Sequence, residues 1–147
     1  MTVITKIQNV STKKNNGDRA EENFDFFMNG KISGKDSKAY NIDSDVNCNG
    51  IGYSVKSNHF SLVSAGLLKG ETMAEMLDYY FATVHSDYAV YVDLENNAYI
   101  MNMKEFREML ETFATLERES QKNGGGLKIR CRAETKKMKV WLNVRCV

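Results

Sequence analysis

The chain has 147 residues and a formal net charge of +1 at pH 7, with 42% apolar and 27% charged residues. These values are typical of a single folded globular domain. No apolar run approaches the roughly 20 residues that a membrane-spanning helix needs, and residues 1–16 are polar without a signal-peptide core. We therefore expect one cytoplasmic domain without a membrane partner, in which residues 1–16 form a loose or edge segment.

The cysteines and histidines do not form a recognisable metal or disulfide pattern. Cys48, Cys131 and Cys146 are odd in number, widely spaced and without a Cys-x-x-Cys pair. This spacing favours free thiols in a reducing compartment. His59 and His85 have no Cys or His partner at ligand spacing, so a zinc site is not expected.

The first predicted helix covers residues 19–28 and is capped by Asp18 or Gly17. It ends at Asn29–Gly30. Its apolar face is formed by Ala20, Phe24 and Phe27. Two short strands, 38–43 and 50–56, follow around a turn at Asn47–Gly50, where the Asn-Gly pair favours a hairpin.

A second helix is predicted to start at Thr72. Its apolar stripe consists of Met73, Met76, Leu77, Tyr80 and Phe81. Strands at 88–93 and 98–102 then flank a turn at Glu95–Asn97.

The last predicted helix spans residues 104–121 and stops at Asn123–Gly126. Its apolar side consists of Phe106, Met109, Leu110, Phe113 and Leu116. Strands at 127–132 and 139–144 are expected to close the chain as a hairpin. The resulting order, α-β-β-α-β-β-α-β-β, predicts an α/β (α+β) fold with a mixed sheet flanked by helices.

The stretch from Asp45 to Lys56 has features that a Mg²⁺-dependent phosphodiesterase needs. Asp45 lies just after the predicted strand 38–43 and could bind a hard cation through oxygen. After the turn, the next strand ends in Val55–Lys56, and a residue two positions before the lysine shares its face of the strand. The lysine could orient water and offset charge that develops on phosphate. Ser54 occupies the position where a second acid would complete this set.

These residues resemble the D…(D/E)-x-K core of the PD-(D/E)XK nuclease and Holliday-junction-resolvase superfamily. Gly17-Asp-Arg-Ala-Glu21 also resembles the helical Gly-x-x-Ala-Glu opening of such domains, and the match covers roughly residues 17 to 60. The resemblance implies a restriction-endonuclease-like core, DNA as substrate and Mg²⁺ as cofactor.

The resemblance also implies roles for individual residues. Asp45 would be the first metal ligand, with Asp43 as the alternative, and Lys56 would be the catalytic lysine. Glu21 would be an additional catalytic acid near the metal. The chain departs from the pattern at Ser54, because a serine hydroxyl is a poorer Mg²⁺ ligand than a carboxylate. Candidates to supply the missing acid are Glu21, Glu22, Glu71 and Glu75.

The C-terminal part of the chain is basic. From Lys122 onward eight Lys and Arg residues accompany a single acid, Glu134. Lys128, Arg130 and Arg132 alternate, so a strand would present them on one face at intervals of roughly 7 Å. This row could follow a phosphate backbone, or it could be the solvated face of an edge strand, where lysines discourage aggregation. The residues expected to contact nucleic acid are Lys128, Arg130, Arg132, Lys136, Lys137, Lys139, Ser57 and His59.

Three function classes follow from the sequence. The first is a divergent Mg²⁺-dependent DNA endonuclease that hydrolyses phosphodiesters. The second, favoured by Ser54, is an inactive interaction, inhibitor or accessory protein of a mobile element such as a phage or plasmid. Such a protein would bind a protein or a nucleoprotein complex. The third is a scaffold that forms a homodimer through an exposed strand edge.

Overall fold

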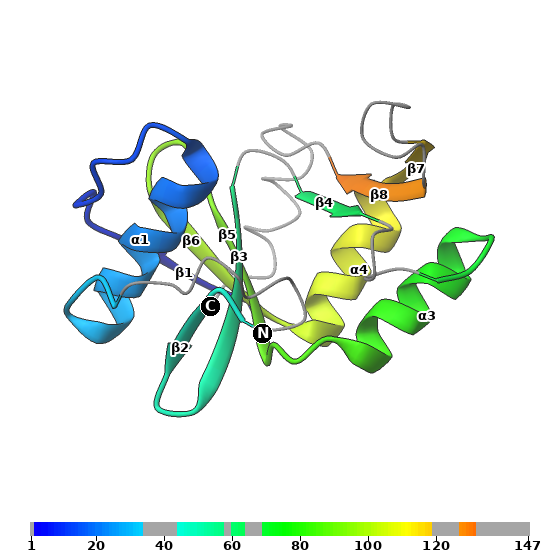
Figure 1. Cartoon of the computed structure of the whole chain (residues 1–147), viewed down its shortest axis with the longest axis horizontal. Helices are drawn as coiled ribbons and strands as arrows, with labels where there is room; N and C mark the ends of the chain where they lie inside the picture. The colour runs from blue at the N-terminus through cyan, green and yellow to red at the C-terminus, as the bar shows by residue number, and fades with distance from the viewer. Residues whose placement is uncertain (1, 34–43, 58–59, 64–68, 119–126, 132–147) are drawn as a thin grey trace.

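A computed structural model of the chain describes residues 2–33, 44–57, 60–63, 69–118 and 127–131 (Figure 1). Its centre is a five-stranded sheet in the order β1-β6-β5-β3-β2. These strands are β1 (Val3–Lys6), β2 (Val46–Cys48), β3 (Ile51–Ser57), β5 (Tyr88–Val92) and β6 (Asn97–Asn102). Strands β3 and β5 are parallel and the other neighbours are antiparallel. The predicted mixed α/β fold is confirmed, and β1 lies at one edge of the sheet.

Helices cover both faces of this sheet (Figure 1). Helix α1 (Asn16–Asn29) packs on one face, and α3 (Met73–Thr83) and α4 (Met103–Phe113) pack on the other. Side chains along a strand alternate between faces, so Tyr53 points towards α1 while Ser54 points towards α3. Each face therefore has its own core, and β3 contributes to both sides of the molecule.

Helix α1 begins earlier than predicted. The side chain of Asn15 accepts hydrogen bonds from the backbone N–H groups of Gly17 at 2.8 Å and Asp18 at 3.2 Å. Asn15 is therefore the N-cap, and the expected caps Gly17 and Asp18 are helical residues. The predicted end is confirmed, because Gly30 has φ 73° and its N–H donates to the carbonyl of Phe26.

The buried face of α1 also differs from the expected one at one position. Phe27 is 44% exposed, whereas Asn23 is fully buried. The side-chain oxygen of Asn23 accepts hydrogen bonds from the backbone N–H groups of Val10 and Ser11, each at 2.8 Å. Its amide nitrogen donates to Asn9 at 3.0 Å. The helix thus uses a polar residue to fix the N-terminal segment.

The hairpin predicted around Asn49–Gly50 joins β2 to β3. Asn49 has φ 52° and Gly50 has φ 80°, and two-residue turns with positive φ at both positions match the twist of paired strands. The first strand of this hairpin is β2, at 46–48. The strand expected at 38–43 lies outside the described residues.

The other predicted elements up to residue 113 are present. Strands β5 and β6 form the expected hairpin. Thr72 caps α3 by accepting the N–H of Glu75 at 3.2 Å. Helix α4 starts with a capping box between Asn102 and Glu105.

The prediction that the last helix continues to residue 121 is wrong. Helix α4 ends at Phe113, Ala114 is extended with φ −80° and ψ 153°, and β7 (Thr115–Arg118) follows. Strand β7 pairs with β8 (Leu127–Cys131), which pairs on its other edge with β4 (Phe60–Val63). The helical spacing of the apolar residues was misleading because backbone pairing with β8 outweighs local helix propensity.

The small sheet has the order β4-β8-β7 and lies beside α4 (Figure 1). Strand β8 was predicted, but we expected residues 139–144 as its hairpin partner. Those residues lie outside the described part of the chain, within which the neighbours of β8 are β4 and β7. Ile129 of β8 is fully buried and joins the core between the large sheet, α3 and α4. Of the helices described, none has the length and apolar character needed to cross a membrane.

Candidate functional site

Asp45 and Ser54 face each other at the open end of the β2–β3 hairpin. The two strands pair with Val46 opposite Tyr53, and the same register continued by one residue places Asp45 opposite Ser54. The Oδ2 atom of Asp45 accepts a hydrogen bond from the backbone N–H of Val55 at 2.8 Å. The first acid of the motif is therefore at the strand end, with its carboxylate bound to the strand backbone.

Ser54 is closed off by Tyr80 of α3. Ser54 is 7% exposed and Tyr80 is 3% exposed, and the two side chains lie close enough for Ser54 to affect the pKa of the phenol. Burial, followed by the nearby charge of Asp45, raises the pKa of Tyr80 to about 12, although the neighbouring Ser54 acts in the opposite direction. The phenol is consequently neutral at physiological pH. These three residues are named the Asp45–Ser54–Tyr80 cluster below.

Lys56 lies two residues beyond Ser54, so it occupies the same face of β3. It is half-buried and stands opposite Tyr91 of β5 in the parallel register. The structure therefore brings Asp45, Ser54 and Lys56 to one side of the sheet. This placement matches the spacing argument made from the sequence.

Glu21 is placed differently. It lies on α1, which packs against the Tyr53 face of β3, whereas Ser54 contacts α3 on the opposite face. The described residues include no group of three or more His, Cys, Asp or Glu side chains that could hold a metal ion. Asp43 and His59, which were also expected near the site, lie outside the described part of the chain.

Two of the other acids considered for the missing position have local roles. Glu22 accepts a hydrogen bond from the hydroxyl of Ser11 at 2.6 Å. Glu75 accepts one from the hydroxyl of Thr72 at 3.0 Å, within the cap of α3. Glu71 is exposed just before that cap.

The predicted basic face is described in part. Arg130 directly follows the buried Ile129 on β8, so its position belongs to the face of the small sheet away from the core. Arg130 stands opposite Thr115 of β7. Its Nε atom is buried and has no hydrogen-bond partner among the described residues. Arg132, Lys136, Lys137 and Lys139 lie outside that range.

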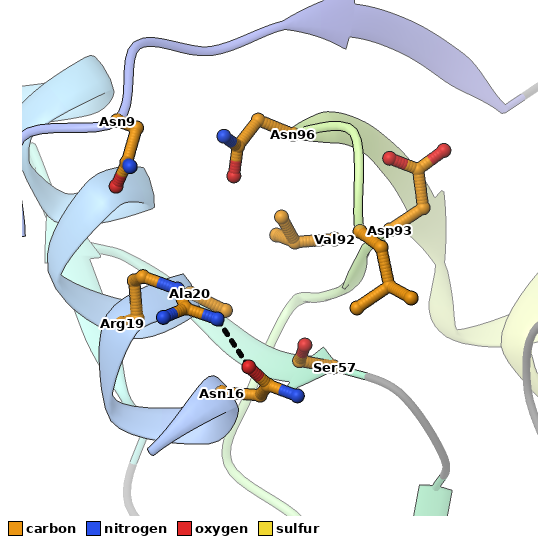
Figure 2. Close-up of a pocket in the computed structure, with 9 residues that line it drawn as sticks. Asn9, Asn16, Arg19, Ala20, Ser57, Val92, Asp93 and Asn96 are labelled. Carbon is orange, nitrogen blue, oxygen red and sulfur yellow. Dashed lines mark hydrogen bonds between the residues drawn. The ribbon is translucent and has the colours of Figure 1, made fainter. Parts of the chain in front are cut away.

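A polar pocket lies at the carboxyl ends of the parallel strands β3 and β5 (Figure 2). Ser57 ends β3, Val92 ends β5, and the first turn of α1 forms a side wall. The pocket has a volume of about 140 Å³. Its polar lining consists of Asn9, Asn16, Arg19, Ser57, Asp93 and Asn96. The carboxyl ends of strands in α/β sheets are a frequent place for ligands.

The acid of this pocket has a structural role. Asp93 is 4% exposed, and its Oδ1 atom accepts the backbone N–H groups of Glu95 and Asn97, each at 2.9 Å. Its Oδ2 atom accepts the side-chain amide of Asn97 at 3.1 Å. In Figure 2 the carboxylate is turned away from Arg19. Asp93 therefore stabilises the β5–β6 turn that carries the pocket wall.

Arg19 is the cation of the pocket. One of its terminal nitrogens donates to the side-chain oxygen of Asn16 in the preceding turn of α1 (Figure 2). Within the described ranges no carboxylate pairs with Arg19. The guanidinium is thus held in place by a neutral partner and keeps most of its donors.

The sequence predicted only Ser57 among these pocket residues. The sequence places Asn9 in the N-terminal loose or edge segment, Asn96 in a turn and Arg19 in a helix. The parallel pairing of β3 with β5 would have shown that these residues lie around one pocket, because it puts Ser57 next to Val92. That pairing is a property of the tertiary fold and is not encoded in the local spacing of either strand.

Comparison with known proteins finds no matching family model, no matching curated protein and no matching solved structure.

Proposed function

We propose that this chain is a nucleic-acid-binding protein that does not cleave its ligand and whose β2–β3 hairpin resembles a nuclease core. The observation that supports this most strongly is the environment of Ser54. At the position where the resemblance expects a second carboxylate, a serine is buried beside the side chain of Tyr80. Metal-dependent phosphodiester hydrolysis instead needs oxygen ligands around an open coordination position.

The oxygen atoms of the Asp45–Ser54–Tyr80 cluster are poor ligands for Mg²⁺. The Oδ2 atom of Asp45 already accepts the N–H of Val55. Ser54 offers a neutral hydroxyl, and Tyr80, with its pKa raised to about 12, offers a neutral phenol. Mg²⁺ prefers near-octahedral oxygen ligands and usually keeps several waters, which the closed packing of Ser54 against Tyr80 does not favour. We therefore assign the cluster the role of joining the hairpin to α3.

Charge distribution supports nucleic acid as the ligand. Residues 122–147 hold eight of the 20 Lys and Arg residues and one of the 19 Asp and Glu residues. The remaining 121 residues therefore hold 12 basic and 18 acidic side chains. A polyanion is attracted to the basic end and repelled by the rest, so the charge asymmetry favours contact with a phosphate backbone through the C-terminal segment.

We also propose a reducing compartment, the cytoplasm. Cys48 is a free thiol, half-buried, and its Sγ atom contacts the carbonyl oxygen of Met28 at 3.5 Å. A small, partly buried thiol of this kind is stable where disulfides do not form.

A binding titration with a matched charge control tests the nucleic-acid ligand. Fluorescence anisotropy with labelled duplex and single-stranded oligonucleotides would be measured at several salt concentrations. The test variant carries three Lys→Gln changes, at Lys136, Lys137 and Lys139. The control carries the same changes at Lys31, Lys69 and Lys104, which are exposed and lie outside the basic segment. Both variants lose three positive charges.

The two variants should behave differently. Wild type and control should bind with a clear salt dependence, and the test variant should bind more weakly at every salt concentration. Its slope of log affinity against log salt should fall by up to about three, since each lost phosphate contact reduces the slope by roughly one. An equal loss of affinity in the test and control variants would show only an effect of net charge. Absence of binding by folded wild type at low salt would end the nucleic-acid proposal and favour a protein partner.

A further inference from the structure

We propose that the pocket at the ends of β3 and β5 binds a tetrahedral oxyanion of the phosphate class. It lies on the α1 side of the sheet, whereas the Asp45–Ser54–Tyr80 cluster lies on the α3 side. The inference goes beyond the proposed function and does not depend on it. It rests on the cavity, the hydrogen-bond donors in its wall and the balance of charge among them.

The strongest donor is Arg19. A guanidinium has five N–H donors in a planar fork whose spacing matches two oxygens of a phosphate. Asn16 uses one terminal nitrogen of Arg19, and no other partner is present among the described residues. Asn16 therefore orients the fork and leaves donors for a ligand.

The neighbouring amides are also oriented as donors. The side-chain oxygen of Asn16 is occupied by Arg19, and that of Asn9 is occupied by the amide nitrogen of Asn23 at 3.0 Å. Their NH₂ groups have no partner within the described ranges. Ser57 adds a hydroxyl, and Asn96 adds an amide from the opposite wall (Figure 2). Four neutral groups, the Arg19 cation and the Asp93 carboxylate thus line the space, and the carboxylate is turned away from Arg19 (Figure 2).

The same contacts argue against a cation as the ligand. The carboxylate of Asp93 is held by the N–H groups of Glu95 and Asn97 and is turned away from Arg19 (Figure 2). The amide oxygens of Asn9 and Asn16 are likewise occupied. A bound cation would meet the guanidinium with few available oxygen ligands, whereas an anion would be stabilised by it.

The pocket also has suitable dimensions. Its volume of about 140 Å³ is close to that of cavities of roughly 150 Å³ that accept a molecule as large as benzene. Phosphate is no larger than benzene and would leave space for water. The helix amides of Gly17 and Asp18 are already capped by Asn15, so recognition would come from side chains and not from the α1 terminus.

A phosphate titration followed by NMR tests this site. Inorganic phosphate would be added to ¹⁵N-labelled protein at constant ionic strength while the backbone N–H signals of Ser57 and Asn96 and the Nε–H of Arg19 are recorded. We expect saturable shifts at all three. Arg19→Gln should weaken the affinity about tenfold or more, because charge-assisted hydrogen bonds to the ligand are lost. Arg107→Gln, the same change on α4 at the other face, should leave the affinity unchanged.

Thermal unfolding of both variants would establish that they are folded. A second arm compares a 5′-phosphorylated dinucleotide with its unphosphorylated form and with inorganic phosphate. Tighter binding of the phosphorylated dinucleotide than of inorganic phosphate would identify the end of a nucleic acid as the source of the anion. Equal affinity for these two ligands would identify a free anion. The inference would be overturned if the chemical shifts at the wild-type pocket did not saturate with phosphate. It would also be overturned if Arg19→Gln and Arg107→Gln bound phosphate with the same affinity. The C-terminal Lys→Gln variant should retain phosphate binding, which separates this test from the one for nucleic acid.

Discussion

The side chain of Ser54 on β3 lies beside the phenol of Tyr80 on α3, close to the charge of Asp45. Both residues are nearly inaccessible to solvent, so their contact belongs to the packed interface between β3 and α3. This contact fastens the β2–β3 hairpin to the helix layer. It also gives a physical reason for serine at a position where a nuclease would need an acid.

Ser54→Asp should destabilise the protein by about 3–5 kcal/mol at pH 7, because it buries a charge beside the like charge of Asp45. The measurement is urea unfolding followed by circular dichroism. Ser54→Ala serves as a control that removes the hydroxyl alone and should cost only about 1–2 kcal/mol.

The loss of unfolding free energy in Ser54→Asp should become smaller as pH falls towards 4, because the new carboxyl group becomes protonated. Addition of millimolar Mg²⁺ should not restore stability. A variant as stable as wild type, or one rescued by Mg²⁺, would contradict the closed environment described for Ser54 and would favour a metal site.

Tyr80→Phe should change how stability depends on alkaline pH. Burial raises the pKa of Tyr80 from 10.0 to about 12, so the unfolded state releases this proton first as pH rises. The stabilising contribution is complete below pH 10 and is lost between about pH 10 and 12. Unfolding free energies of wild type should therefore fall through this window by up to about 2–3 kcal/mol more than those of Tyr80→Phe. Parallel curves for the two proteins would show that Tyr80 titrates normally.

Asn23→Ala should cost about 2–4 kcal/mol. Its side chain satisfies the backbone N–H groups of Val10 and Ser11, and unpaired buried donors are costly. Limited proteolysis should also cleave the N-terminal segment faster. Asn29→Ala, which alters an amide nearer the exposed end of α1, should lose less than about 1 kcal/mol. A similar loss in both variants would argue against a special role for Asn23.

Glu105→Gln should weaken the start of α4 and its contact with Thr2, the residue before β1. The Glu105 side chain accepts hydrogen bonds from the N–H of Asn102 at 3.1 Å and the hydroxyl of Thr2 at 2.9 Å. Burial alone would raise the pKa of Glu105, but these hydrogen bonds lower it below its ordinary value of 4.5. The carboxylate therefore stabilises the fold above pH 4.5, and this contribution is lost as pH falls through the lowered pKa.

The expected cost of Glu105→Gln at pH 7 is about 1 kcal/mol, typical of a lost helix cap. Its stability should also change less than that of wild type between pH 5 and 3. Acid titrations of unfolding, monitored by fluorescence of the protein, would compare the two. An identical acid dependence would contradict the assigned role of the carboxylate.

Local chemistry made several parts of the fold predictable from the sequence. Thr72 caps α3, Asn49–Gly50 turns between β2 and β3, and Gly30 ends α1, because each residue meets a geometric need within a few positions of the chain. The placement of Lys56 on the face of Ser54 likewise follows from strand alternation alone.

The remaining features depend on contacts between distant segments. Helical spacing through Leu116 predicted a longer α4, but pairing with β8 makes Thr115–Arg118 a strand. Tyr80 could be recognised as a core residue but not as the partner of Ser54, since that contact requires the packing of α3 on β3. The pocket around Arg19 was missed for the same reason.

The most direct test of a binding protein without nuclease activity is a DNA cleavage assay in the presence of Mg²⁺ or Mn²⁺. Supercoiled, linear and branched DNA would each be incubated with wild type, Asp45→Ala and Lys56→Ala, and product analysis would follow a gel-shift assay on the same samples. We predict that wild type retards the DNA and leaves it uncut with either metal. Metal-dependent cleavage by wild type that disappears in both variants would contradict this account and establish an active nuclease site.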